Sequence, residues 1–219
     1  MTASESFSAT DLPAFVWDTT ETGPGSEPRA ESAHDGTPGE VGLWVFILGD
    51  MTLFGLLFAV FLWEKRNDRP TFAESAAHLH LGLGAINTLV LLLSSYLVVL
   101  ALHTHRQGSA RSASALLVGV LGCAITFVAL KAFEYSAAVT SGHVVTTNMF
   151  WTFYFVLTGV HLLHVLIGAV LVILWRSKCR AGILPAGGQR FPEIAAVYWH
   201  MVDLLWVVIF TLLYVGCFE

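Results

Sequence analysis

Five long, continuous apolar runs constrain this chain more than any other feature of its sequence. They extend over residues 42–63, 79–102, 114–138, 149–175 and 193–217. Each is close to or above the 20 or so residues that a helix needs to cross a hydrocarbon core roughly 30 Å thick. Backbone groups in lipid must find partners within the segment, which favours helices, and continuous runs do not fit the alternating strands of a barrel. The sequence therefore predicts an all-α fold, an integral membrane bundle of five transmembrane helices.

The composition agrees with this prediction. Hydrophobic residues make up 55% of the chain and charged residues 12%, with a mean hydropathy of +0.68. A soluble domain of this size carries about twice that charged fraction. The net charge of −5 does not indicate a nucleic-acid partner. We therefore expect the partners to be found in the membrane.

The first forty residues form a segment of a different kind. They hold eight acids against one basic residue, Arg29, and are rich in Ser, Thr, Gly and Pro. Such a segment buries too little apolar surface to order itself, and it lacks the basic start and apolar stretch of a signal peptide. We expect residues 1–40 to form an acidic, disordered arm in the cytoplasm and residues 41–219 to form the five-helix membrane domain.

The distribution of Lys and Arg predicts the orientation of the chain. With five spans, one side of the membrane receives seven basic residues: Arg29, Arg106, Arg111, Arg176, Lys178, Arg180 and Arg190. The other side receives four: Lys65, Arg66, Arg69 and Lys131. Because basic loops remain in the cytoplasm, we expect a multi-pass protein of the inner (plasma) membrane with its N-terminus inside and its C-terminus outside.

Aromatic residues near the predicted span ends fit the same arrangement. They are Trp44, Trp63, Trp151, Trp175 and Tyr214. Amphipathic rings gather where the membrane meets water. We therefore expect these five side chains at the two interfaces.

Polar residues inside the spans are the candidates for function, because burying them in lipid is costly. They are Asp50, Asn87, Thr88, Glu134, His161, His164, His200 and Asp203. His161 and His164 are three residues apart and share a helix face. At a rise of about 1.5 Å per residue, the two aspartates, His164 and His200 lie at similar depth in the cytoplasmic half of the bilayer. We expect these groups to face the protein interior, with at least one acid paired to a histidine of another helix.

A buried polar network that holds the helices in register is the expected role of this set. The alternatives left open are a metal site, a haem site and a proton path. His-x-x-His is a weak metal signal, because a closed site needs three or four ligands, and the three cysteines include no Cys-x-x-Cys pair. A small transporter is a further alternative, weakened by the lack of a convincing internal repeat. We expect no catalytic, metal-binding or cofactor-binding residue in the chain.

Two further sets of residues predict contacts at the surface. Small and hydroxyl residues on the second span allow close helix approach, so we expect the face of Ser94 and Ser95 to dock on a large catalytic subunit. At the cytoplasmic end of the fourth span, Arg176, Lys178 and Arg180 are candidates for binding anionic lipid headgroups, at about 1 kcal/mol each. A simple orientation signal explains the same three basic residues.

Five segments stand in a fixed order across residues 39–217. They are GEVGLWVFILGD, INTLVLLLSS, KAFEY, TGVHLLHVLIG and YWHMVDLLWVVIF. In order and spacing, they resemble the subunit III family of haem–copper cytochrome oxidases. The resemblance implies the short five-helix form, which lacks the first two helices of longer members. It also implies a non-catalytic accessory subunit that binds phospholipid and supports the assembly, stability and proton uptake of a catalytic, subunit I-like partner in aerobic electron transport.

Two positions depart from the pattern of many family members. Gly82 stands where they have a glutamate shortly before the Asn-Thr pair, and Gly49-Asp50 stands where they have Ser-Glu. Together with the short length, these features resemble the branch associated with nitric oxide reductase. The resemblance therefore leaves two complexes open, an oxygen-reducing oxidase and, as the alternative, a nitric oxide reductase of denitrification.

Overall fold

The structure, a computed structural model, describes residues 41–183 and 190–216. Its helices are α1 (Val41–Asn67), α2 (Arg69–Ala77), α3 (Leu81–Arg106), α4 (Ala110–Thr140), α5 (Met149–Arg180) and α6 (Arg190–Phe210). A π-helical turn, Thr211–Val215, continues α6. Five of these helices are long and apolar enough to cross a membrane, and the predicted all-α membrane bundle is confirmed. The predicted acidic arm lies outside the described residues.

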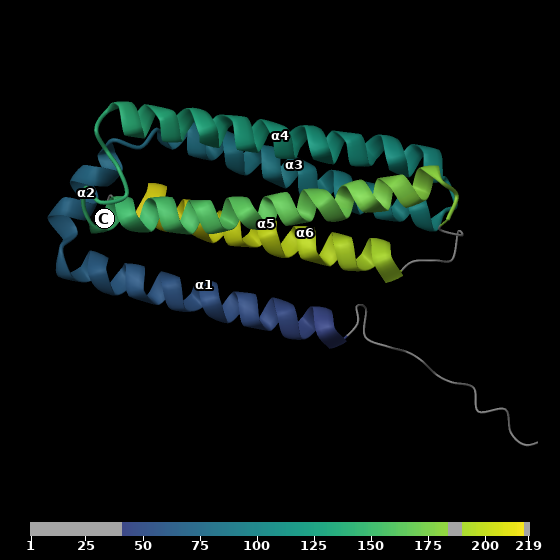
Figure 1. The fold of residues 1–219 in the computed structure, drawn as a ribbon, viewed down its shortest axis with the longest axis horizontal. Coiled ribbons are helices and arrows are strands. Elements are labelled where there is room, and N and C mark those ends of the chain that lie inside the picture. Colours follow the sequence, from purple (N-terminus) through teal and green to yellow (C-terminus); the bar gives the residue numbers. More distant parts are fainter. Residues whose placement is uncertain (1–40, 184–189, 217–219) are drawn as a thin grey trace, which may run out of the picture. The chain divides into compact units, whose positions relative to one another are not determined.

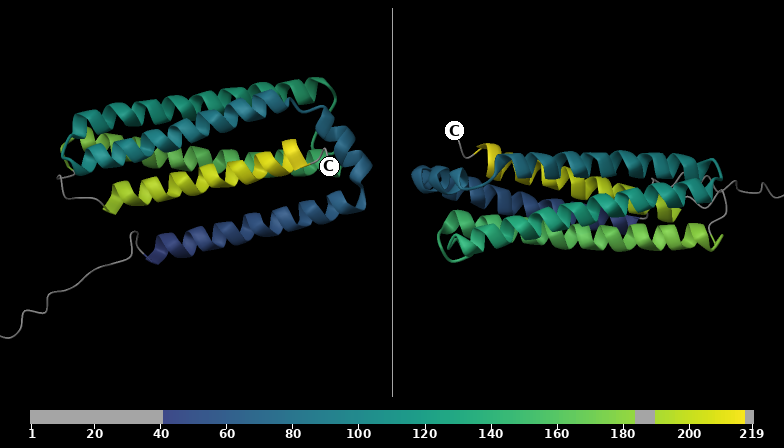
Figure 2. Two further views of the ribbon diagram at one scale, coloured as in Figure 1. Left: turned by 180° about the vertical axis from the view of Figure 1, so that it is seen from behind. Right: turned by 90° about the horizontal axis from the view of Figure 1, so that it is seen from above.

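The helices α3 to α6 form a four-helix bundle (Figure 1). The four pack in a ring, because each contacts the next along the chain and α6 returns to contact α3. Helix α1 lies along the edge formed by α5 and α6, as both views of Figure 2 show. Its buried residues, Asp50, Phe54 and Phe61, follow one stripe of the helix. The rest of the α1 surface is largely exposed, so one side of this helix packs on the protein and the other is left uncovered.

The linker predicted between the first two spans is partly helical, which the sequence prediction missed. Asp68 caps α2 by accepting a hydrogen bond from the Thr71 amide (3.4 Å), and a proline occupies the first turn. Both features are typical of a helix start and were visible in the sequence. The Phe72 ring packs against Phe61 of α1 and Phe150 of α5, with centroids 5.5 and 5.7 Å apart. Helix α2 therefore ties the end of α1 to the start of α5.

The core of the four-helix bundle is rich in large aromatic side chains. Trp199 of α6 can lie close to α5 because position 168 is glycine. A Cβ atom there would stand 2.9 Å from Cε3 of Trp199, closer than packed atoms approach. Gly168 therefore sets the distance between α5 and α6 at this level.

The five aromatic residues predicted at the interfaces all lie near helix ends. Trp44 and Trp63 are exposed near the two ends of α1. Trp151, Trp175 and Tyr214 are buried. They lie on the faces that turn toward neighbouring helices, and their rings pack within the protein.

Candidate functional site

Lys131 of α4 is buried inside the bundle, only 1% exposed. Its ammonium group donates hydrogen bonds to Oε2 of Glu134 (2.9 Å) and to the hydroxyl of Tyr214 (2.7 Å). The Tyr214 hydroxyl in turn donates to Oε1 of Glu134 (2.5 Å). Four aromatic rings lie 4.9–5.9 Å from the ammonium: those of Tyr135, Tyr154, Trp206 and Tyr214. The ion pair with Glu134 and the cation–π contacts with these rings therefore offset the free-energy cost of removing the Lys131 ammonium from water.

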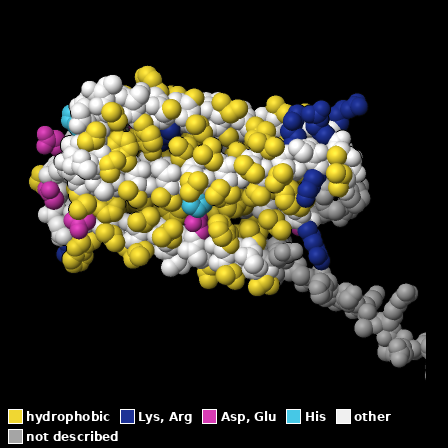
Figure 3. Space-filling model, viewed as in Figure 1, with side chains coloured by type: hydrophobic (Ala, Val, Ile, Leu, Met, Phe, Trp, Pro, Cys, Tyr) yellow, Lys and Arg dark blue, Asp and Glu magenta, His cyan; other side chains and the backbone are white. Residues whose placement is uncertain are grey.

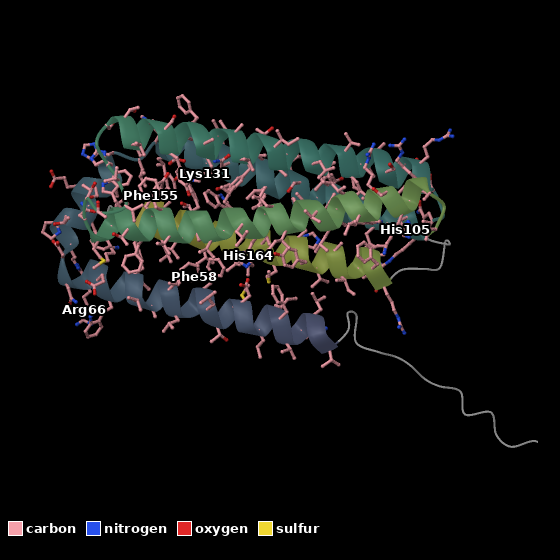
Figure 4. The ribbon with its side chains drawn as sticks, viewed as in Figure 1. Phe58, Arg66, His105, Lys131, Phe155 and His164 are labelled. Carbon is pink, nitrogen blue, oxygen red and sulfur yellow. The ribbon has the colours of Figure 1, made fainter. Side chains whose placement is uncertain are left out.

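The local sequence explains how the Lys131 cluster forms. Lys131 and Glu134 are three residues apart and share one face of α4, which continues to Thr140. Tyr214 comes from the π-helical turn after α6 and reaches across the bundle. Figure 4 shows Lys131 within the bundle. Counting Lys131 as a loop charge was therefore wrong; its spacing from Glu134 was the signal that could have placed it in the core.

Asp50 of α1 and His164 of α5 form a second buried pair. Nε2 of His164 lies 3.0 Å from Oδ1 of Asp50, and the side chains are 9% and 6% exposed for histidine and aspartate. Nδ1 of His164 lies 2.7 Å from the carbonyl oxygen of Val160, which can only accept a hydrogen bond. A neutral imidazole that donates from Nδ1 has no proton on Nε2. The hydrogen bond to Asp50 thus requires one further proton, shared by an imidazole and a carboxyl group.

This contact is the acid–histidine pair between helices that the sequence predicted. It is a polar link from α1 to the helices α3 to α6, and Lys65 makes a second by donating a hydrogen bond to the carbonyl oxygen of Gly216, just after α6. Phe54 and Phe61 supply the apolar part of the stripe that contains Asp50. The ring of Phe54 packs edge-on against His164, with centroids 5.5 Å apart. The pair therefore fixes the position of α1 against α5.

A third group of polar contacts joins α3 to α6. The indole N–H groups of Trp199 and Trp206 donate to Ser94 (3.0 Å) and Thr88 (3.1 Å). Oγ of Ser95 lies 2.6 Å from Nδ1 of His200. The docking face predicted at Ser94 and Ser95 is therefore wrong, because both hydroxyl groups bind α6 of the same chain.

Three of the predicted residues take no part in these contacts. Asn87, His161 and Asp203 are buried, and their side-chain polar atoms have no hydrogen-bond partner among the described residues. His161 packs instead against the rings of Phe127 and Trp206. Ser95 lies beside the Asp203 carboxyl but forms its hydrogen bond to His200. The predicted set thus divides into separate clusters.

The basic residues at the end of α5 differ in their freedom to bind a ligand. Nζ of Lys178 lies 3.9 Å from the ring centroid of Phe191, whereas Arg180 is exposed. Arg176 is partly buried. Across residues 41–183 and 190–216, no group of three or more His, Cys, Asp or Glu side chains is placed to hold a metal ion.

Comparison with known proteins gives consistent results. A family model described as cytochrome c oxidase subunit III matches residues 33–217. The chain is 32% identical over 177 residues to "Cytochrome c oxidase subunit 3" of Thermostichus vulcanus, covering 80% of this chain and 86% of that protein. It is 28% identical over 184 residues to "Probable quinol oxidase subunit 3" of Staphylococcus saprophyticus (84% and 92%). The protein of the same name from Staphylococcus aureus strain USA300 is 29% identical over 181 residues (83% and 90%).

Proposed function

The chain belongs to the cytochrome c oxidase subunit III family, and we propose that it docks in the membrane against a catalytic, subunit I-like partner of the haem–copper type. As a family member it is a non-catalytic accessory subunit of a haem–copper oxidase. The observation that carries this function is the family match, which spans all five membrane helices. The relatives described above have oxidase names, so the nitric oxide reductase alternative gains no support.

The surface where α1 meets α5 is our candidate for the docking face. In Figure 3 a histidine and an acidic side chain interrupt the apolar surface midway between its ends, and Figure 4 labels His164 there from the same side. Exposing polar side chains to lipid midway along the helices costs free energy. A partner helix over this surface would remove the remaining exposure of His164 and Asp50.

A pair of tryptophan variants tests this docking face. Leu163 is exposed beside His164, whereas Ile125 is exposed on α4. We expect Leu163→Trp to reduce co-purification of a haem-containing membrane subunit by about tenfold, equivalent to losing about 1.4 kcal/mol of binding. Ile125→Trp, the matched control, should leave the yield of the complex unchanged. Loss of the complex in Ile125→Trp alone would place the interface on α4, and absence of any haem protein in the wild-type preparation would overturn the proposed partner.

We also propose that the end of the bundle where α4 begins and α5 ends faces the cytoplasm. With Lys131 removed from the count, this end still has six described basic residues: Arg106, Arg111, Arg176, Lys178, Arg180 and Arg190. The other end has three: Lys65, Arg66 and Arg69. Dark blue side chains gather at the first end in Figure 3. The positive-inside rule supports this orientation.

Cysteine labelling in intact cells can test the orientation. In a variant whose native cysteines are replaced by alanine, Glu74→Cys of α2 should react with a membrane-impermeant maleimide added outside. Ser112→Cys of α4 should react only after the membrane is opened. Both positions are exposed on the protein surface, so the side of the membrane on which each cysteine lies decides whether the maleimide reaches it. The reverse labelling pattern would invert the proposed topology.

Anionic lipid headgroups are our proposed ligands for Arg176, Lys178 and Arg180. Each basic group near an anionic leaflet contributes about 1 kcal/mol of attraction. Because Lys178 already packs on Phe191, we expect Arg180 to contribute most. Replacing all three by glutamine should lower the anionic lipid retained by the purified chain in native mass spectrometry. Unchanged lipid retention would mean that the three basic residues do not bind lipid and act only as a signal for the orientation of the chain.

A further inference from the structure

Three histidines gather at the end of the bundle where α4 ends and α5 begins. His78, His80 and His143 line one polar cavity of about 340 Å³, together with Glu134 and Trp151. His78 and His80 are exposed, and His143 is half-buried. No hydrogen bond joins any of these three imidazoles to another described residue. Their ring nitrogens are therefore free to take a ligand from solution.

The backbone fixes the positions of His78 and His143. His78 ends α2, where its amide donates to the carbonyl oxygen of Ser75 (3.2 Å). After α4, Gly142 has a φ of 84°, and the His143 amide donates back to the carbonyl oxygen of Ala138 (2.9 Å). This is the Schellman pattern of a helix end, which favours glycine at the left-handed position. Two separate elements therefore hold the two histidines beside each other.

The separation of these two imidazole rings suits a shared metal ion. Their centroids are 4.9 Å apart, and His143 also stacks on Trp151 with centroids 4.5 Å apart. An ion about 2.0–2.1 Å from a ring nitrogen lies about 3.2 Å from the centroid of that ring. Two centroids 4.9 Å apart then subtend about 100° at the ion, close to the tetrahedral angle. Water would fill the remaining positions, since no three-ligand group occurs among the described residues.

Two helix ends make this location favourable for a cation. His78 lies at the C-terminal end of α2, and His143 directly follows the end of α4. Each such end carries a partial negative charge of up to roughly half a unit. Glu134 adds a carboxylate to the cavity wall, but Lys131, 2.9 Å from it, balances that charge. The exposed carboxylate of Glu74 lies one turn before His78 on α2 and adds to the attraction.

We propose that His78 and His143 bind a divalent transition-metal ion, which ties the end of α2 to the turn after α4. Imidazole nitrogen suits Zn²⁺ and Cu²⁺, whereas Mg²⁺ and Ca²⁺ prefer oxygen ligands. His80 lines the same cavity from the linker before α3 and contributes less, because its ring does not pack with the other two. The site departs from the sequence expectation of no metal-binding residue, and it is independent of the docking face proposed above.

Metal titration of the full chain, purified in mild detergent without a polyhistidine tag, tests the site. His78→Phe and His143→Phe keep an aromatic ring for packing but have no ligand nitrogen. His103→Phe is the matched control, because His103 is exposed at the opposite end of α3 from the cavity. By calorimetry we expect the wild type and His103→Phe to bind one Cu²⁺ more tightly than one Zn²⁺. Each of the other two variants should bind either ion at least about tenfold more weakly.

Spectroscopy and stability measurements complete the test. The paramagnetic resonance spectrum of bound Cu²⁺ should show coupling to nitrogen that His78→Phe and His143→Phe lose. Zn²⁺ should raise the melting temperature of the wild type but not of these variants, because it binds the folded state. If His143→Phe is unstable without metal, the exposed His78→Phe decides. Equal affinity in the wild type and both variants, equal binding of Mg²⁺, or loss of the site in His103→Phe would overturn the proposal.

Discussion

Replacing Lys131 by methionine is expected to destabilise the chain by about 3–5 kcal/mol, because the substitution leaves the Glu134 carboxylate buried without its countercharge. Methionine matches the length of lysine and fills the same aromatic cage, so little of the loss would come from packing. The measurement is the free energy of unfolding in mixed detergent micelles, followed by circular dichroism. We expect the single variant to accumulate poorly in the membrane for the same reason.

Two further variants separate charge from packing in the Lys131 cluster. The double variant Lys131→Met/Glu134→Leu removes both charges and should be more stable than Lys131→Met alone, since no buried charge is left unpaired. Tyr214→Phe removes only a hydroxyl group and should cost about 1–3 kcal/mol. A double variant as unstable as the sum of its single variants would show that the two side chains act independently.

Replacing His164 by leucine is the second substitution for which we expect a large loss of stability. It leaves the Asp50 carboxyl buried between α1 and α5, at a cost of about 3–5 kcal/mol while the group stays ionised. Asp50→Leu leaves only an unsatisfied imidazole nitrogen and should cost about 1–3 kcal/mol. The double variant should be more stable than His164→Leu, because both polar groups are gone.

The measurement for this pair should resolve α1 from the remaining helices. Proteolysis or cysteine labelling near Phe54 and Phe61 would report release of α1, since their faces are buried against the bundle. The matched control is Glu74→Leu, which removes an exposed carboxylate from α2. If Glu74→Leu released α1 as readily as His164→Leu, the release could not be assigned to the loss of the Asp50–His164 pair.

The sequence was sufficient for the long helices and the family. The hydropathy of each span and its length relate directly to the thickness of a bilayer, so α1 and α3 to α6 follow from composition alone. The motifs that resemble subunit III lie within residues 33–217, which the family model matches. The pairing of an aspartate with a histidine also followed from sequence, because helix rise places Asp50 and His164 at one depth.

Only the tertiary structure decided which side chains meet. The sequence analysis counted Lys131 as a loop charge. In the structure its face of α4 packs toward Tyr154, Trp206 and Tyr214. Ser94 and Ser95 were predicted to form an external docking face. In the structure their hydroxyl groups bind Trp199 and His200 of α6. Helix periodicity gives a residue's face and depth, but the partner of that face depends on how several helices pack together. In a membrane the lipid is as apolar as the core, so hydrophobicity alone does not separate the two faces of a helix.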